Sequence, residues 1–160
     1  PQHLPLVVHT GNSRDVADAL DAGASGVEHG PRDRLSDELH HRLKQSNTAY
    51  DPTLSVWDAQ AQFAAGQPDL LARTLVQQTV SPNGLTPTRK MLRERAAKSD
   101  CSGGSDAQPC LDPAAMRRIF DQGVENLRRA YQVGVTLVTG SDAGNPLVFH
   151  GPTVQRELQL

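Results

Sequence analysis

The stretch Leu-Pro-Leu-Val-Val-His-Thr-Gly, residues 4–11, decides how the rest of the chain is interpreted. Its continuous apolar run, Leu6 to Val8, is typical of a strand whose two faces are both covered, as in a parallel sheet. The run ends at His9, and Ser13 then offers an N-cap oxygen to a helix that Gly23 can end. The stretch therefore predicts a strand that is followed directly by a helix.

The same unit repeats along the chain. In sequence order, the predicted elements are a strand at 25–30, a helix capped by Ser36, a strand at 48–54 with Pro52 at its end, helices at 56–65 and 70–78, a helix between Asp112 and Gly134, a strand at 135–138 and the start of a helix at 154–160. The long helix is expected to face the core with Met116, Ile119, Phe120, Gly123, Leu127, Ala130 and Tyr131. Strands that alternate with helices indicate an α/β fold with a parallel sheet.

Two α/β architectures compete at this length. A doubly wound sheet would be complete at 160 residues, whereas a (β/α)8 barrel needs about 250 residues, so that this chain would supply about half of one. A nucleotide-binding doubly wound fold favours Gly-x-Gly-x-x-Gly after the first strand, and this chain has His-Thr-Gly-Asn-Ser there instead. Periodicity alone leaves both architectures open.

The composition argues against two classes of partner. With 16 basic and 18 acidic residues, a net charge of −2 and 4% aromatic residues, the chain lacks the basic stripe and the stacking residues of a nucleic-acid-binding protein. No stretch reaches the roughly 18 consecutive apolar residues of a membrane-spanning helix, and no basic-then-apolar leader opens the sequence. We therefore expect neither a nucleic-acid partner nor a membrane span.

A polar region at 81–113 interrupts the repeating pattern and is interpreted as an insertion. One reading is a solvated excursion whose charges contact nothing. The other is a lid over the site, in which an acidic substrate group would meet Arg89, Arg93 and Arg95. Loops that follow barrel strands lie on the catalytic face, so the position of the region is compatible with the second reading.

The same region carries Cys101 and Cys110. Their spacing could close a small disulfide loop, or the two thiols could be unrelated. A disulfide would favour an exported protein, periplasmic or secreted, and without it a cytoplasmic location is equally open.

Polar side chains stand where three of the predicted strands end. His9 ends the first strand, His29 the second and Asp142 the last. Because strand ends of one sense lie at one edge of a parallel sheet, these side chains could converge, and two imidazoles with one carboxylate suit Zn²⁺ or a similar divalent ion. Taken singly, each residue is as well explained as a hydrogen-bonded structural group.

Of the other histidines, one could reach the predicted site and two are not expected to. His40 and His41 are adjacent in a predicted helix, so their side chains point about 100° apart and are expected to be solvated. His150 follows the Asp142 strand, where a loop could return it to the same face. Asn145 and His150 are therefore the candidates for substrate contact.

Four segments carry a resemblance to a known family. They are Val-Val-His-Thr, Val-Glu-His-Gly, Asp-Pro-Thr-Leu and the run Val-Thr-Leu-Val-Thr-Gly-Ser-Asp-Ala-Gly-Asn-Pro. Together they resemble the metal-dependent amidohydrolase superfamily, and within it the imidazolonepropionase-like and Xaa-Pro dipeptidase-like branch. The resemblance implies that residues 1–160 are the C-terminal half, strands five to eight, of a TIM-type (β/α)8 barrel.

The resemblance also implies roles for the strand-end residues. His9 and His29 match the metal-ligand histidines of strands five and six, and Asp142 matches the aspartate of strand eight that contacts the metal and transfers the proton. In one-metal relatives, the residue that matches His29 stabilises the substrate instead. The implied activity is metal-dependent hydrolysis of carbon–nitrogen bonds in amides, peptides or cyclic amides, with one or two divalent ions, Zn²⁺ being the favoured one, and a small-molecule or dipeptide-like substrate.

One departure from the family pattern limits that expectation. The His-x-His pair of strand one and the metal-bridging lysine of strand four have no counterpart in this sequence. A half-barrel would also leave two open sheet edges, which invite the missing N-terminal half or a second copy of the chain. The alternative function is therefore a catalytically incomplete binding or assembly module.

Overall fold

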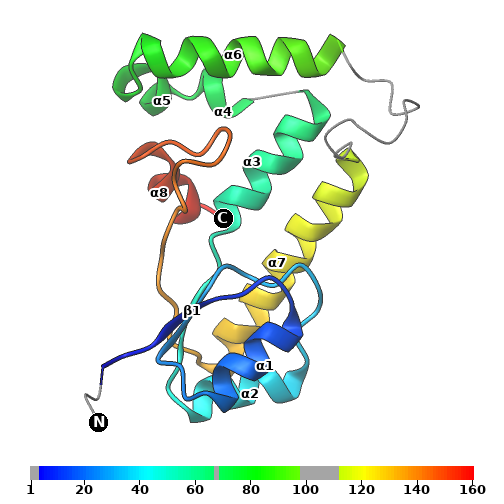
Figure 1. The fold of residues 1–160 in the computed structure, drawn as a ribbon, viewed down its shortest axis with the longest axis vertical. Coiled ribbons are helices and arrows are strands. Elements are labelled where there is room, and N and C mark those ends of the chain that lie inside the picture. Colours follow the sequence, from blue (N-terminus) through cyan, green and yellow to red (C-terminus); the bar gives the residue numbers. More distant parts are fainter. Residues whose placement is uncertain (1–3, 67–68, 98–111) are drawn as a thin grey trace.

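Three short parallel strands form the sheet of this protein. The computed structural model describes residues 4–66, 69–97 and 112–160. Its strands are β1 (Val7–His9), β2 (Gly26–Glu28) and β3 (Ala49–Asp51), and they lie in the order β1-β2-β3 (Figure 1). The fold is thus α/β with a small parallel sheet, and Pro52 follows the end of β3 as predicted.

The predicted strand at 135–138 is reduced to a single bridge. Leu137 pairs in parallel with Tyr50, whose N–H donates to Thr136 O at 2.9 Å and whose carbonyl accepts from Val138 N at 3.1 Å. The segment therefore continues the sheet on the far side of β3. The spatial order of the strand-like segments follows their order in the chain.

Eight helices surround or extend this sheet in the described ranges. They are α1 (Ser13–Asp21), α2 (Asp37–Gln45), α3 (Leu54–Ala65), α4 (Asp69–Ala72), α5 (Thr74–Thr79), α6 (Pro82–Ala97), α7 (Pro113–Val133) and α8 (Pro152–Glu157). Ser36 and Asp112 cap α2 and α7 as predicted, but α1 is capped by Asn12, which forms a capping box with Asp15. None of these helices, within the part of the chain that is described, has the length and apolar character needed to cross a membrane.

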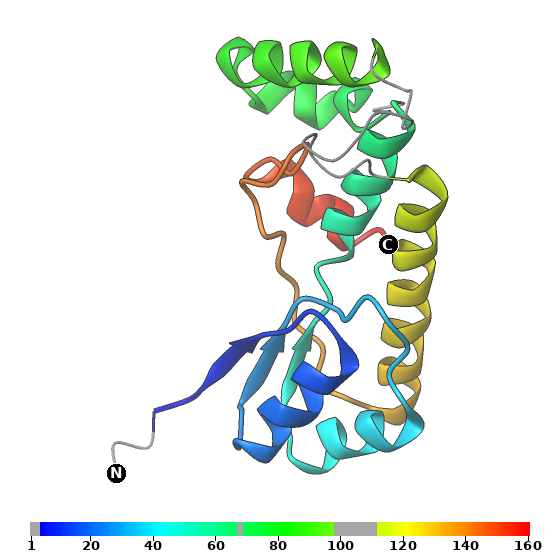
Figure 2. The same cartoon turned by 45° about the vertical axis from the view of Figure 1, so that its right-hand side comes forward.

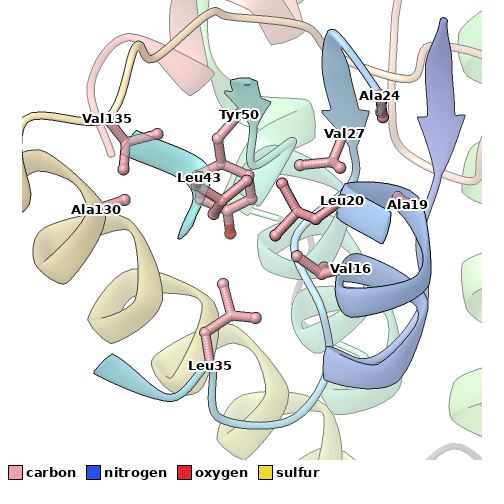
Figure 3. Packing of buried hydrophobic residues seen from close by; sticks show 10 residues of the cluster. All are labelled: Val16, Ala19, Leu20, Ala24, Val27, Leu35, Leu43, Tyr50, Ala130 and Val135. Carbon is pink, nitrogen blue, oxygen red and sulfur yellow. The ribbon is translucent and has the colours of Figure 1, made fainter. Parts of the chain in front are cut away.

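Helices cover one face of the sheet and extend the molecule at one end. Figure 2 shows α1, α2 and the C-terminal part of α7 on the same side of the strands. Helices α4, α5 and α6 lie at the opposite end of the molecule from α1 and α2, and α7 extends toward that end. The main core lies under the covered face, where Val27 and Tyr50 of the sheet meet helix residues (Figure 3); its members are Val16, Ala19, Leu20, Ala24, Val27, Leu35, Leu43, Tyr50, Ala130 and Val135. A second hydrophobic cluster contains residues of α3, α4, α5 and α6 and of the loop at 147–149.

The prediction that both faces of strand β1 are covered is wrong. Leu4, Leu6 and Val7 are 76%, 45% and 53% exposed, and only Val8 packs partly against the core. Of this run, Val8 alone packs toward the helices, and Val7 on the opposite face is exposed. The apolar run is an open edge strand.

Two side chains of the helices lie opposite to their predicted environment. His40, expected in solvent, is 1% exposed because its Nδ1 lies 2.9 Å from Ser36 O and its Nε2 3.1 Å from Asn126 O. Tyr131, expected in the core, is 75% exposed. Phe120, Gly123 and Ala130 of the predicted face are buried, and Asn126, which was not predicted, joins them. These residues follow the three- and four-residue spacing of a helix.

The predicted polar insertion is helical in its first half. Leu85 and Leu92 of α6 are 5% and 6% exposed and join the second cluster, because a spacing of seven residues returns them to one helix face. Arg89 contacts Gln77 on α5 through an Nη2–Oε1 distance of 3.4 Å, and Arg93 is exposed. The side chain of Arg95 and both Cys101 and Cys110 lie outside the described residues.

Candidate functional site

The predicted residues His9, His29 and Asp142 line one cavity of about 370 Å³. Each lies at or just after the carboxyl end of a strand-like segment, and Thr53, which follows β3, completes the series. Parallel strands bring these ends to a single edge of the sheet, so residues far apart in the sequence meet there. The convergence expected from the sequence is therefore present.

The two histidines contact each other directly. The ring centroids of His9 and His29 are 4.7 Å apart, with an interplanar angle of 67°, which is an edge-to-face contact. His29 Nδ1 lies 3.0 Å from Thr53 Oγ1 and 4.0 Å from Asp142 Oδ2. Thr53 thus engages Nδ1 and leaves Nε2 of His29 with no partner among the described residues.

Asn145 orients the carboxylate of Asp142. Its Nδ2 donates to Asp142 Oδ2 at 2.9 Å and to the backbone carbonyl of Asp142 at 3.0 Å. This pair of bonds fixes both the side chain and the backbone of the aspartate. Asn145, predicted as a substrate contact, therefore sits within the site as a direct neighbour of Asp142.

Backbone strain is concentrated at the same strand ends. His29, Thr53 and Asp142 have φ values of 68°, 42° and 44°, in the left-handed region that residues with a side chain rarely adopt. Two further described residues share this feature away from the cavity lining, Asn47 and Leu147. Strained conformations of this kind cluster at functional sites, where the surrounding structure holds them in place.

Thr53 and Thr10 support His29 and were given no role from the sequence. Thr10 is 1% exposed and its Oγ1 donates to the carbonyl of His29 at 2.8 Å, while Thr53 contacts the ring. Both threonines stand next to predicted strand ends, in Val-Val-His-Thr and Asp-Pro-Thr-Leu. That position is the signal that could have identified them.

A pair of carboxyl groups lies beneath the cavity in the strand register. Glu28 pairs with Asp51 across β2 and β3, and Asp51 Oδ1 accepts from Gly140 N at 3.1 Å and Thr53 N at 3.2 Å. Burial raises the pKa of Glu28, and the charge of Asp51, a hydrogen bond with it and the charge of Asp142 raise that pKa further. Asp51 thus accepts from two backbone amides, and the pKa of Glu28 beside it lies above its ordinary value.

His150 lies apart from the strand-end residues. It is exposed and lines a neighbouring cavity of about 560 Å³, together with Met91 and Phe149. Asn145 borders both cavities. The structure thus connects the two substrate-contact candidates through a shared wall, but only Asn145 is in contact with Asp142.

The donor set has the right chemistry for a divalent cation, although the side chains do not surround one. Two imidazoles and a carboxylate are typical zinc ligands. Within the described residues, however, no three His, Cys, Asp or Glu side chains are grouped so that they could hold one ion. The ring of His9 instead lies edge-to-face against the ring of His29.

Comparisons with known proteins support the fold. No protein-family model and no curated protein matches the chain. A solved structure of a Xaa-Pro dipeptidase, with methionine bound in its active site, is similar at a TM-score of 0.55 and 19% sequence identity. The similarity covers 98% of this chain and 28% of that one. The chain therefore shares its α/β fold with a distantly related dipeptidase, and it spans little more than a quarter of that protein's length.

Proposed function

We propose that this chain supplies catalytic and metal-binding side chains to a hydrolase that cleaves carbon–nitrogen bonds in amides, peptides or cyclic amides. The observation that carries the proposal is the convergence of His9, His29 and Asp142 in one cavity, from three separate strand ends. The distant similarity in fold to a dipeptidase supports the same reaction class. Dipeptide-like small molecules are the substrates that fit this proposal.

His9 and His29 would hold the metal ion, with Zn²⁺ as the favoured ion and one or two ions as the range, and Asp142 would complete the ligand set. When bound, such an ion would supply a water whose pKa is lowered toward about 7 and would polarise the substrate carbonyl. Asp142 would accept the proton of that water and return it to the leaving nitrogen. Asn145 holds the carboxylate ready for that transfer through its 2.9 Å hydrogen bond.

His29 has a second role in this proposal. Its Nδ1 is engaged by Thr53 Oγ1 at 3.0 Å, so Nε2 is the nitrogen available to a metal or to the substrate. Fixing one ring nitrogen sets the tautomer and the direction of the other. With Nε2 available, His29 could either bind the metal or stabilise the reacting carbonyl of the substrate.

The architecture that we propose around this site is the C-terminal half of a (β/α)8 barrel. Strand-like segments succeed one another in chain order from β1 to Leu137, which is the arrangement of consecutive barrel strands. The solved dipeptidase is several times longer than this chain. The missing half would bring the remaining ligands and cover the open face of the sheet.

A binding or assembly module is the second candidate function. The specific observation in its favour is the exposed apolar edge of β1, with Leu4, Leu6 and Val7, and the exposure of Val138 at the other side of the sheet. Open edges with apolar side chains favour pairing with another chain. The partner would be the complementary half of the barrel or a second copy.

Hydrolysis of a small panel tests the proposal. The longest expressed form of the protein, loaded with Zn²⁺, is assayed with dipeptides, N-acyl amino acids and cyclic amides, and released amine is measured. Asp142→Asn is expected to lower the rate by roughly 10²- to 10⁴-fold, because the proton carrier is lost. Asp18→Asn, at an exposed position on α1, is the matched control and should keep the full rate. Hydrolysis that survives Asp142→Asn, or a panel in which nothing is hydrolysed, contradicts the proposal.

A further inference from the structure

An arginine without an anionic partner borders the candidate site. The Arg32 guanidinium carbon lies 5.4 Å from the centre of the Trp57 ring, and both side chains line the cavity that holds His29 and Asp142. No ion pair or side-chain hydrogen bond joins Arg32 to another described residue. Its backbone N–H donates to Gly11 O at 3.2 Å, which ties the loop after β2 to the loop after β1.

The contact with Trp57 leaves the N–H donors of Arg32 available for a ligand. A guanidinium that lies over an aromatic ring uses its face for the ring and keeps the N–H donors at its edge. Those donors form a planar fork that matches a carboxylate in two parallel hydrogen bonds. Trp57 therefore holds Arg32 in the state that recognises a carboxylate.

The rest of the cavity lining is mostly uncharged. Among the described lining residues, the permanent charges are Arg32 and Asp142, and the apolar wall is made by Val56, Met116 and Ile119. A ligand in this cavity thus meets one cation, one carboxylate and an apolar surface. A monoanion with an apolar side chain is the chemical class that complements them.

We propose that Arg32, held over Trp57, binds the free carboxylate of the substrate. The substrate class is then N-acyl amino acids and dipeptides with a free C-terminal carboxylate, and the apolar wall receives the side chain next to that carboxylate. The proposal rests on the proposed function for the identity of the bond that is cleaved, but the recognition of the carboxylate does not depend on hydrolysis. A single guanidinium suits one carboxylate better than a phosphate dianion, which would need further cations.

Binding of a matched pair of probes tests this inference. N-acetyl-leucine carries the carboxylate, and N-acetyl-leucinamide is its neutral counterpart. Trp57 is the single tryptophan of the chain, so its fluorescence reports binding beside Arg32, and calorimetry gives the dissociation constants independently. We expect the acid to bind at least tenfold more tightly than the amide.

Two variants of Arg32 and one control sharpen the test. Arg32→Gln should remove the preference for the acid, and Arg32→Lys should keep only part of it because lysine lacks the fork. Arg34→Gln changes an exposed arginine outside the cavity lining and should keep the full preference. Equal binding of acid and amide to the unchanged protein, an equal loss in Arg34→Gln, or tighter binding of inorganic phosphate than of the acid would overturn the inference.

The outcomes also separate this inference from the proposed function. If the acid binds through Arg32 and no panel member is hydrolysed, the inference stands and the proposed function fails. If dipeptides are hydrolysed and their C-terminal amides are hydrolysed equally well, the proposed function stands and the inference fails. Asp142→Asn should keep the preference for the acid while it loses hydrolysis.

Discussion

At the scale of single residues, Thr53 has an unusual position. It precedes α3 at the place of an N-cap residue, yet its side chain makes no capping hydrogen bond and contacts His29 Nδ1 instead. Its φ of 42° is costly for a β-branched residue. The hydroxyl of Thr53 therefore contacts His29 and does not cap α3.

Removing that hydroxyl should weaken the site. Thr53→Ala is expected to lower zinc affinity by roughly 10- to 100-fold, the usual effect of losing a group that orients a metal ligand. Thr53→Ser keeps the hydroxyl and should remain close to the unchanged protein. Zinc affinity is measured by competition with a chelator of known strength. Equal affinities for Thr53→Ala and Thr53→Ser would show that the contact with His29 has no such role.

The sequence predicts the strand-end residues of the site but not their supports. His9, His29 and Asp142 stand at the ends of predicted strands, and that placement is visible in the sequence. Thr53 is hidden because a hydroxyl residue before a helix is normally read as its cap. Arg32 and Trp57 could not be recognised because a cation–π contact between a loop and helix α3 leaves no periodic pattern in the sequence.

At the scale of elements, α3 is capped from a distant part of the chain. The Glu157 carboxylate of α8 accepts from Leu54 N at 2.8 Å and from Ser55 N at 2.6 Å. Glu157 is 9% exposed, and its negative charge lies at the positive end of the α3 dipole. The capping contact fixes the start of α3, and with it the position of Thr53.

Loss of this cap should destabilise the protein. Glu157→Ala leaves two buried backbone amides without an acceptor and is expected to lower the free energy of unfolding by about 1–3 kcal/mol. Gln155→Ala, at an exposed position of the same helix, should change it by less than about 0.5 kcal/mol. Urea unfolding followed by circular dichroism measures both. A Glu157→Ala protein as stable as Gln155→Ala would contradict the capping role.

The same carboxyl group predicts a pH dependence of stability. Burial raises the pKa of Glu157 above its ordinary value of 4.5, against the opposing effect of its hydrogen bonds with Ser55 and Leu54. A carboxyl whose pKa is raised by folding stabilises the folded protein fully below its unfolded pKa, and this contribution is lost as the pH rises through the folded pKa. Glu157→Gln should remove that loss, so the difference in stability between variant and unchanged protein should shift in favour of the variant as the pH rises from about 4.5. A difference that stays constant with pH would contradict the raised pKa.

Helix caps and boundaries are predicted well where a cap is local. Ser36, Asp112 and Gly134 act at the ends predicted from the sequence, because each contact spans only a few residues. The buried face of α7 also includes Asn126, whose Oδ1 accepts from Leu35 N at 3.0 Å and whose Nδ2 donates to Asp33 O at 2.9 Å. A buried asparagine with such distant partners cannot be recognised from polarity.

At the scale of the whole molecule, the order of the strands could be predicted from the sequence. The extent to which other parts of the protein cover the sheet could not. The strand-like segments from β1 to Leu137 lie side by side in chain order, as repeated strand–helix units favour. The apolar run of β1 predicts a strand covered on both faces, yet Val7 is 53% exposed. The apolar run of β1 therefore stays uncovered among the described residues, and in the proposed barrel another part of the barrel would cover it.

The most direct test of the proposed site is a zinc titration of the folded chain and its variants. We predict that the unchanged chain binds zinc stoichiometrically. We expect His9→Ala, His29→Ala and Asp142→Asn each to weaken binding at least tenfold, because in the proposed site the three side chains would hold the same ion. His41→Ala removes an exposed histidine of α2 and should leave binding unchanged. A folded chain that binds no zinc, or one in which His41→Ala weakens binding as much as His9→Ala does, would contradict a shared site at the three strand ends.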